Sequence, residues 1–163
     1  MNSNTTNFEK VREFNAVFGV PEHTNAQENI TKEKPDLTKL RLDLITEECQ
    51  EFKDAVEQHD FVEMVDALAD ILYVVYGAGA SFGVDLNKAF DIVHKSNMSK
   101  VCKTEEEAKE TVAWYKKNGT YDSPSYRKHM GYWIVYNESS GKVLKSINYK
   151  KVKFNMGELA LEQ

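Results

Sequence analysis

The sequence predicts an all-α fold, a bundle of four or five helices followed by a small C-terminal β-hairpin. Apolar residues recur at helical spacing, with capping residues between the segments, from residue 8 to residue 118. After Pro124 the pattern changes to the alternation typical of strands. The chain has 163 residues, 41% hydrophobic and 29% charged, which suits one soluble globular domain. We therefore expect a helical domain over residues 1–120, with a hairpin and tail over 121–163 packed on it.

The first predicted helix covers residues 8–18, where apolar side chains recur at helical spacing, and it ends at Gly19. A polar stretch over 20–36 follows, in which Pro21 and Pro35 predict a loop. A connection of this length is long for a compact domain. Two interpretations stay open for it: a lid over a site, or a disordered connector.

Three more helices are predicted over residues 37–57, 61–81 and 86–100. Asp36 is the candidate N-cap of the first of these helices, and Asp85 is that of the third. Both assignments rest on the ability of a short side-chain oxygen to accept hydrogen bonds from free backbone N–H groups.

A fifth helix is predicted to open with a capping box at 104–107 and to close at 116–119, where two lysines precede Asn and Gly. Beyond it, the aromatic and β-branched run 132–136 predicts a strand. Turn residues at 137–141 and alternation over 142–149 complete the expected hairpin, whose exposed face is basic.

The net charge of −5 is unevenly distributed along the chain. Residues 47–70 contain nine acids and one lysine, a formal charge of −8, whereas residues 142–153 contain five lysines and no acid. A globally acidic protein is a poor candidate for non-specific DNA binding, so no nucleic-acid partner is expected. An acidic cluster inside an apolar pattern instead suggests a bound cation.

Neither a membrane span nor a signal peptide is expected. The longest charge-free run, 71–84, has 14 residues, while a membrane helix needs about 17–25. The first residues lack the basic and apolar regions of a signal peptide. Cys49 and Cys102 form neither a metal-type spacing nor a disulfide framework, which favours a reducing compartment. We therefore expect a cytoplasmic protein.

Acidic residues lie on two predicted helices in positions that surface charges do not usually occupy. At about 100° per residue, Glu47, Glu48 and Glu51 lie on or beside the apolar stripe of helix 37–57. On helix 61–81 a narrow stripe opposite the broad apolar face contains Glu63, Asp66, Asp70 and Tyr73. A helix with this pattern is expected to be contacted on both sides.

Antiparallel neighbours joined by a tight connection would bring the two acid stripes together. Closely packed carboxylates repel one another unless something neutralises them, and few bases lie nearby in the sequence. A hard divalent cation, Mg²⁺ or in its place Mn²⁺, resolves this conflict because oxygen ligands suit both ions. The simpler interpretation of any one of these acids alone is a solvated surface residue.

A di-iron carboxylate bundle is the chemical competitor, but it needs Glu-x-x-His on two helices. Only Asp91 and His94 come near that pattern, once and with Asp in place of Glu. The sequence contains no glycine-rich phosphate loop and no signature of a Ser or Cys nucleophile.

Asn97 and Lys100 continue the apolar stripe of helix 86–100. In that position they are suited to hold a phosphate or a sugar near the acids. The alternative is that they cap the helix end and extend along its surface to solvent.

These residues together resemble the signature of the all-α NTP pyrophosphatases, which include MazG-like enzymes, dimeric dUTPases and phosphoribosyl-ATP pyrophosphohydrolases. Glu47, Glu48 and Glu51 precede Glu63 and Asp66 with eleven residues between the two groups, and the stretch 94–100 looks like the family's Asn-x-x-Lys element. The resemblance spans about residues 8–101. The segment 133–149 also looks like the tail of phosphoribosyl-ATP pyrophosphohydrolase-like proteins.

The resemblance implies hydrolysis of a nucleoside triphosphate between its α and β phosphates, giving the monophosphate and pyrophosphate. It implies Glu48, Glu51, Glu63 and Asp66 as metal ligands, and Glu47 as the group that orients or deprotonates water or holds a further metal ion. It further implies that Asn97 and Lys100 contact the nucleotide, with Asp70 and Tyr73 as weaker candidates for substrate contacts. The family is usually dimeric or tetrameric, so a homodimer or homotetramer is expected.

Two other functions stay open at this point. One is a non-catalytic protein that keeps the metal and senses a nucleotide, although the complete set of acids argues against lost chemistry. The other is an interaction module whose hairpin docks a partner while the acids form a structural ion site. The lysines of the hairpin segment either reach phosphates or protect an edge strand.

Overall fold

The computed structural model describes residues 5–161, which contain six helices and two strands. By their internal contacts the residues form two compact units. The first unit comprises residues 1–89 together with 154–163, and the second comprises residues 90–153. The predicted all-α fold with a small C-terminal hairpin is confirmed.

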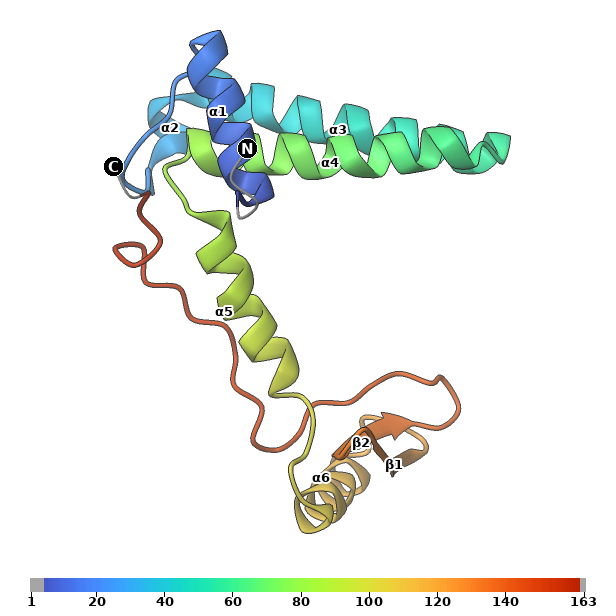
Figure 1. Ribbon diagram of the computed structural model, residues 1–163. Helices are drawn as coiled ribbons and strands as arrows, with labels where there is room; N and C mark the ends of the chain where they lie inside the picture. Colours follow the sequence, from blue (N-terminus) through green and yellow to red (C-terminus); the bar gives the residue numbers. More distant parts are fainter. Residues whose placement is uncertain (1–4, 162–163) are drawn as a thin grey trace. The chain divides into compact units, whose positions relative to one another are not determined.

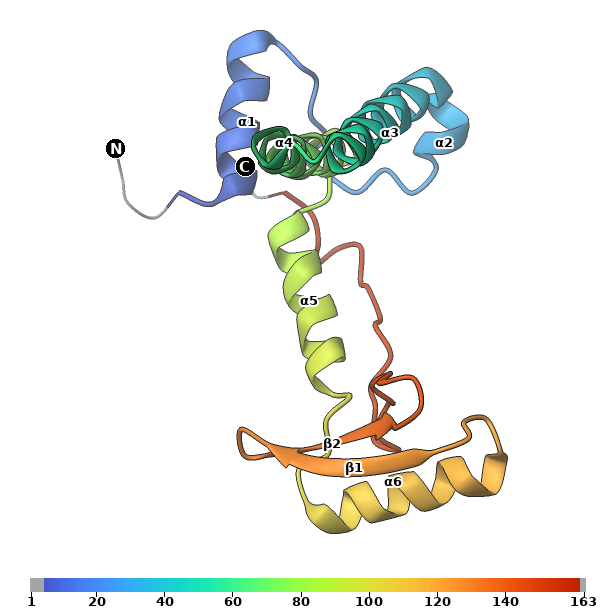
Figure 2. The same cartoon turned by 90° about the vertical axis from the view of Figure 1, so that its right-hand side faces the viewer.

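The first unit is built around two long antiparallel helices, α3 and α4, which lie side by side with α1 crossing them (Figures 1 and 2). Its helices are α1 (Asn7–Phe18), α2 (Ile30–Glu33), α3 (Pro35–Gln58) and α4 (Phe61–Ser81). A two-residue connection joins the long pair: His59 ends α3 with φ 57°, and the Asp60 side chain accepts hydrogen bonds from two N–H groups of α4. This tight connection holds α3 and α4 next to each other.

Capping residues explain where these helices begin and end. Thr6 and Glu9 form a reciprocal capping box at the start of α1, and Gly19 closes it with φ 67°. At α3 the expectation was wrong. The helix starts at Pro35 rather than after an Asp36 cap, because proline's fixed φ and missing N–H suit the first helical position. Asp36 lies in the first turn, where its negative charge interacts favourably with the positive end of the helix dipole.

The segment between α1 and α3 is attached to the end of α4. The backbone N–H of His23 donates to the Ala80 carbonyl at 3.4 Å, and that of Gln27 donates to the Phe82 carbonyl at 2.9 Å. The segment also contains the short helix α2 and the buried side chain of Ile30. It is therefore an ordered part of the first unit, which the interpretation as a disordered connector did not anticipate.

The second unit is a helix packed on a two-stranded antiparallel hairpin. α5 (Leu86–Met98) crosses the boundary between the units; α6 (Glu105–Asn118), β1 (Pro124–His129) and β2 (Tyr132–Asn137) lie in the second. Its core comprises Cys102, Ala108, Val112, Tyr115, Val135 and Leu144. α6 therefore shares one core with the hairpin, and the domain boundary at residue 120 expected from the sequence stays a prediction.

The hairpin forms from a different pair of segments than the sequence predicted. The strands are 124–129 and 132–137, whereas residues 142–149 contribute only an isolated bridge through Val143. The turn consists of Met130 and Gly131, both at positive φ (47° and 81°), as two-residue hairpin turns require. The expected turn at 137–141 also forms: residues 138–140 turn the chain, the Asn137 N–H donates to the Lys142 carbonyl at 2.9 Å, and Gly141 has φ 68°. The Asn137 side chain accepts from the Ser123 N–H at 3.0 Å.

Candidate functional site

The pairing of α3 with α4 brings the predicted acids together. A Cβ at Gly77 of α4 would lie 3.2 Å from the guanidinium of Arg41 on α3. Glu48 lies seven residues after Arg41 on α3, and Asp70 lies seven residues before Gly77 on α4. The carboxylates of Glu48 and Asp70 are close enough for their charges to interact. Antiparallel helices require this correspondence, and it places Glu48 and Asp70 about 10 Å along the helix pair from Arg41.

Glu48 lies at the centre of an acid cluster that comprises Glu47, Glu48, Glu51, Asp66 and Asp70. Its side chain is partly buried, and its Oε2 atom is fully buried without a hydrogen-bond partner. Burial raises the pKa of the Glu48 carboxyl, and the charges of the other four acids raise it further. The ionised form of Glu48 is therefore destabilised by burial and by the neighbouring negative charges, and a bound cation would stabilise it.

Within the described residues, no base neutralises this cluster. Among residues 5–161, none of its five carboxylates lies within ion-pair distance of a lysine, arginine or histidine. The nearest pair along α3 joins Lys53 to Glu57, at 3.9 Å on the exposed side. Glu48 is partly buried and the other four acids are exposed, so the unusual feature is the buried, unpartnered Oε2 atom of Glu48 rather than the cluster as a whole.

The donor chemistry of the cluster fits a hard divalent cation. All its ligating atoms are carboxylate oxygens, and one of them, Oε2 of Glu48, is buried and unpartnered. In the described part of the chain, no three Asp, Glu, His or Cys side chains converge in a metal-binding geometry. Glu48, Glu51 and Asp66 share the cluster, and their role as metal ligands stays a prediction.

Two predicted site residues lie on α4 outside the cluster. Glu63 is exposed in the first turn of α4, where its backbone N–H donates to the Asp60 carboxylate at 3.2 Å. Tyr73 packs its ring edge-on against Phe14 of α1, with the ring centroids 5.6 Å apart. The roles predicted for Glu63 and Tyr73 stay predictions.

Asn97 and Lys100 lie near the end of α5 in the second unit. The helix ends at Met98 rather than residue 100, and the Lys100 ammonium donates to the Asn97 Oδ1 atom at 2.7 Å. The backbone carbonyl of Lys100 accepts from the Ser146 N–H at 3.0 Å. Asn97 and Lys100 are thus neighbours, and their predicted contact with a nucleotide stays a prediction.

Arg41 is a buried charge to which the sequence reasoning gave no role. It donates from Nη2 to the Ser81 hydroxyl at 2.6 Å, while its buried Nε has no partner. Burial lowers the pKa of its guanidinium. His23 donates from Nδ1 to the Ser81 carbonyl at 2.6 Å, and Lys34 donates to His23 Nε2 at 2.6 Å, so three basic residues gather at the end of α4. The sequence feature that could have identified Arg41 as a buried charge is its position in the apolar stripe of α3.

The comparison with known families agrees with this arrangement. The family model for phosphoribosyl-ATP pyrophosphohydrolase matches residues 11–97, more than half of the chain. The chain belongs to the phosphoribosyl-ATP pyrophosphohydrolase family. The match contains both acid-bearing helices and Asn97, and it ends before Lys100 and most of the second unit.

Membership in the phosphoribosyl-ATP pyrophosphohydrolase family supports a nucleotide pyrophosphohydrolase-type activity and confirms the predicted resemblance. The chain is also similar to an uncharacterized protein of Acanthamoeba polyphaga mimivirus. The two are 30% identical over 92% of this chain and 94% of the relative. The similarity to this viral protein therefore extends into the second unit, beyond the family match.

No single described helix is both long and apolar enough to cross a membrane. Only α4 and α5 taken together, as a bent pair, reach the required length and composition.

Proposed function

We propose that this pyrophosphohydrolase-family protein hydrolyses a nucleoside triphosphate between its α and β phosphates in a reaction that depends on Mg²⁺. The observation that supports this proposal best is the unpaired acid cluster around Glu48, with its buried and unpartnered Oε2 atom. The products would be the nucleoside monophosphate and pyrophosphate. Such a reaction removes a triphosphate from the nucleotide pool in one step.

In this proposal Glu48, Glu51, Glu63 and Asp66 hold the cation. When bound, Mg²⁺ supplies neutralisation of the charge that develops on the phosphate oxygens. Glu47, exposed and adjacent in the chain to Glu48, orients the attacking water and accepts its proton. Asn97 and Lys100 bind the nucleotide, with Asp70 and Tyr73 as further contacts to the substrate.

The test is pyrophosphate release from a panel of ribo- and deoxynucleoside triphosphates, with Mg²⁺ and with EDTA. The matched variants are Glu48→Gln and Glu57→Gln, which make the same change on the same helix inside and outside the acid cluster. We expect release that EDTA and Glu48→Gln abolish and Glu57→Gln leaves intact. Turnover that survives Glu48→Gln would overturn the metal assignment, and nucleotide binding without turnover would favour a sensor.

We also propose that the protein is a homo-oligomer that buries one face of α4. Phe61, Val65, Leu68 and Leu72 recur at helical spacing on this helix, and all four are about half exposed or more, with Phe61 at 73%. A second copy of the chain presents the same stripe and can cover it isologously. Light scattering after size exclusion should give a multiple of the 18.7 kDa chain mass, and Leu68→Lys should reduce it. A wild-type monomer would refute the assignment.

A further inference from the structure

The two units of the chain carry opposite charges. The first unit contains nineteen acids and eight lysines or arginines, a formal charge of −11. The second contains thirteen lysines or arginines and seven acids, a formal charge of +6. The acid cluster supplies five of the nineteen acids of the first unit, whereas the proposed chemistry does not use most of the bases of the second.

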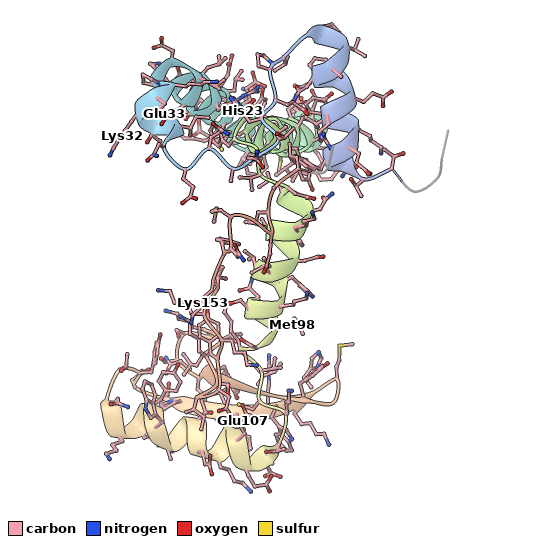
Figure 3. The ribbon with its side chains drawn as sticks, turned by 90° about the vertical axis from the view of Figure 1, so that its left-hand side faces the viewer. His23, Lys32, Glu33, Met98, Glu107 and Lys153 are labelled. Carbon is pink, nitrogen blue, oxygen red and sulfur yellow. The ribbon has the colours of Figure 1, made fainter. Side chains whose placement is uncertain are left out.

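Several of these bases surround a hollow of about 850 Å³ within the second unit. Lys95, Lys103 and Lys150 line it, together with Tyr132 and Met98. A neighbouring hollow of about 520 Å³ shares two of these lysines and adds two more; its lysines are Lys95, Lys150, Lys151 and Lys153 (Met98 and Lys153 can be located in Figure 3). The first volume falls within the range of about 300–1,000 Å³ typical of small-molecule sites.

The lysines of the two hollows have no acidic partners. Within residues 5–161, none of them forms an ion pair with a carboxylate. Glu107 is the one acid that lines the larger hollow, and it already accepts hydrogen bonds from the Lys103 backbone N–H at 2.9 Å and from the Ser146 hydroxyl. Burial opposes ionisation of Glu107, but its hydrogen bonds and the charge of Lys103 outweigh burial and lower its pKa. The ammonium groups of Lys95 and Lys150 interact with no carboxylate of the hollow and are therefore available to an anion, whereas Lys103 also interacts with Glu107.

Local hydrogen bonds fix the wall that carries Lys150. Its backbone N–H donates to the Ser99 hydroxyl at 2.9 Å, and its carbonyl accepts from the Ser96 hydroxyl at 2.8 Å. The buried Ser96 of α5 thereby attaches residue 150 to the helix that carries Lys95. The two lysines are held on adjoining walls of the same hollow by the backbone rather than by their own flexible side chains.

We propose that the second unit binds the phosphate chain of a nucleoside polyphosphate through Lys95, Lys103 and Lys150. The Tyr132 ring and the Met98 side chain, 45% and 44% exposed, supply an apolar surface for the base. This binding needs no metal, so it does not rest on the proposed hydrolysis. A concave hollow with one exposed ring fits a single nucleotide better than a nucleic-acid strand, which needs a groove with several stacking rings.

Binding of ATP to the full-length Glu48→Gln protein in EDTA tests this proposal by titration calorimetry. In this background neither the metal nor turnover contributes to the signal. Lys95→Gln with Lys150→Gln should weaken ATP binding about tenfold or more, because two ammonium–phosphate contacts are lost. Lys116→Gln with Lys117→Gln removes the same charge from the exposed end of α6 and should weaken binding less than twofold.

Two further arms identify the ligand. Tyr132→Thr, which removes the ring but keeps a residue of high strand propensity, should weaken ATP binding but not inorganic tripolyphosphate binding. Equal losses from the two lysine pairs, or no loss from the first, would overturn the proposal. A single-stranded oligonucleotide that binds far more tightly than ATP would also overturn it in favour of nucleic acid.

Kinetics of the otherwise wild-type protein then show which nucleotide occupies the site. If Lys95→Gln with Lys150→Gln lowers kcat/KM as much as it lowers affinity, the hollow holds the substrate. If kcat/KM is unchanged while ATP affinity falls, the hollow holds a second nucleotide that does not react. Both results require the lysine-dependent ATP binding to be present first.

Discussion

Without metal, Glu48→Gln is expected to stabilise the protein, although it removes a residue of the proposed active site. Burial is the larger cause of the raised pKa of Glu48, and the charges of four neighbouring carboxylates raise it further. Among the described residues, no base lies within ion-pair distance of Glu48. A like-charged pair at the helix surface costs a few tenths of a kcal/mol. Four such pairs give about 1 kcal/mol, which the neutral amide of similar shape recovers. For a chain of this size that corresponds to about 2–4 °C in Tm.

Mg²⁺ should reverse the order of the two proteins. A cation that binds only the folded state at ten times its Kd adds about 1.4 kcal/mol to the free energy of unfolding. Wild type gains this stabilisation because Glu48 is ionised and unpartnered, whereas Glu48→Gln loses a ligand and gains less. The variant is thus the more stable protein in EDTA and the less stable one in saturating Mg²⁺.

The pH dependence has a definite sign. Because the pKa of Glu48 is raised above 4.5 in the folded state, the folded protein retains a proton that the unfolded chain has lost. In EDTA this group's contribution to stability is therefore present at low pH and declines as pH rises from 4.5 through the raised pKa. Glu48→Gln should remove that part of the pH dependence.

Thermal denaturation in EDTA and in a series of MgCl₂ concentrations tests this reasoning. Glu57→Gln is the control, since Glu57 lies on the same helix and has only an exposed partner, Lys53, at 3.9 Å. It should change Tm by less than 1 °C in either buffer. A Glu48→Gln protein that is less stable than wild type in EDTA, or equally stabilised by Mg²⁺, would show that Glu48 is not the centre of an unneutralised site.

Three further predictions concern the scaffold. Gly83→Ala should lower the free energy of unfolding in urea by about 3 kcal/mol, because the φ of Gly83 is +71° and a Cβ would lie 2.1 Å from a backbone carbonyl oxygen. Gly119→Ala is the control: its φ is +64° but its surroundings are open, so it should lower the same free energy by about 1 kcal/mol. Leu144→Ala, at 2% exposure, should cost about 3 kcal/mol in the same assay. Thiol titration at pH 8 should label Cys49 but not Cys102, whose burial raises its pKa, until denaturant exposes both.

Helix boundaries could be predicted from the sequence because capping is local. The predicted caps Asp85 and Thr104 each accept a hydrogen bond from an N–H two or three residues ahead, so the residues that decide the boundary are neighbours in the chain. The acid stripes were predictable for a similar reason. Their positions follow from helical periodicity. The two-residue His59–Asp60 connection favours antiparallel packing of α3 against α4.

Pairings between distant segments were harder to predict. The sequence around Gly141 has the composition of a hairpin turn and does turn the chain, but the two strands of the sheet are joined by Met130–Gly131, which no local rule identified. The decision depends on the core that α6 forms with Val135 and Leu144, which only the folded unit shows. The hollow lined by Lys95, Lys103 and Lys150 escaped sequence reasoning for the same cause, since 55 residues of sequence numbering separate its first lysine from its last.

If the hollow of the second unit holds the substrate, the opposite charges of the two units meet two conflicting demands of the proposed reaction. A cation site needs clustered carboxylates, and the same carboxylates repel the phosphate chain of a nucleotide. A single acidic unit of charge −11 would oppose substrate approach, with the repulsion screened only beyond about 8 Å at physiological salt. A separate unit of charge +6 can supply the attraction without placing lysines among the acids, where they would form ion pairs and displace the metal. Metal affinity should therefore depend on Glu48, Glu51 and Asp66, nucleotide affinity in EDTA should depend on Lys95 and Lys150, and mutation of either set should leave the other affinity unchanged.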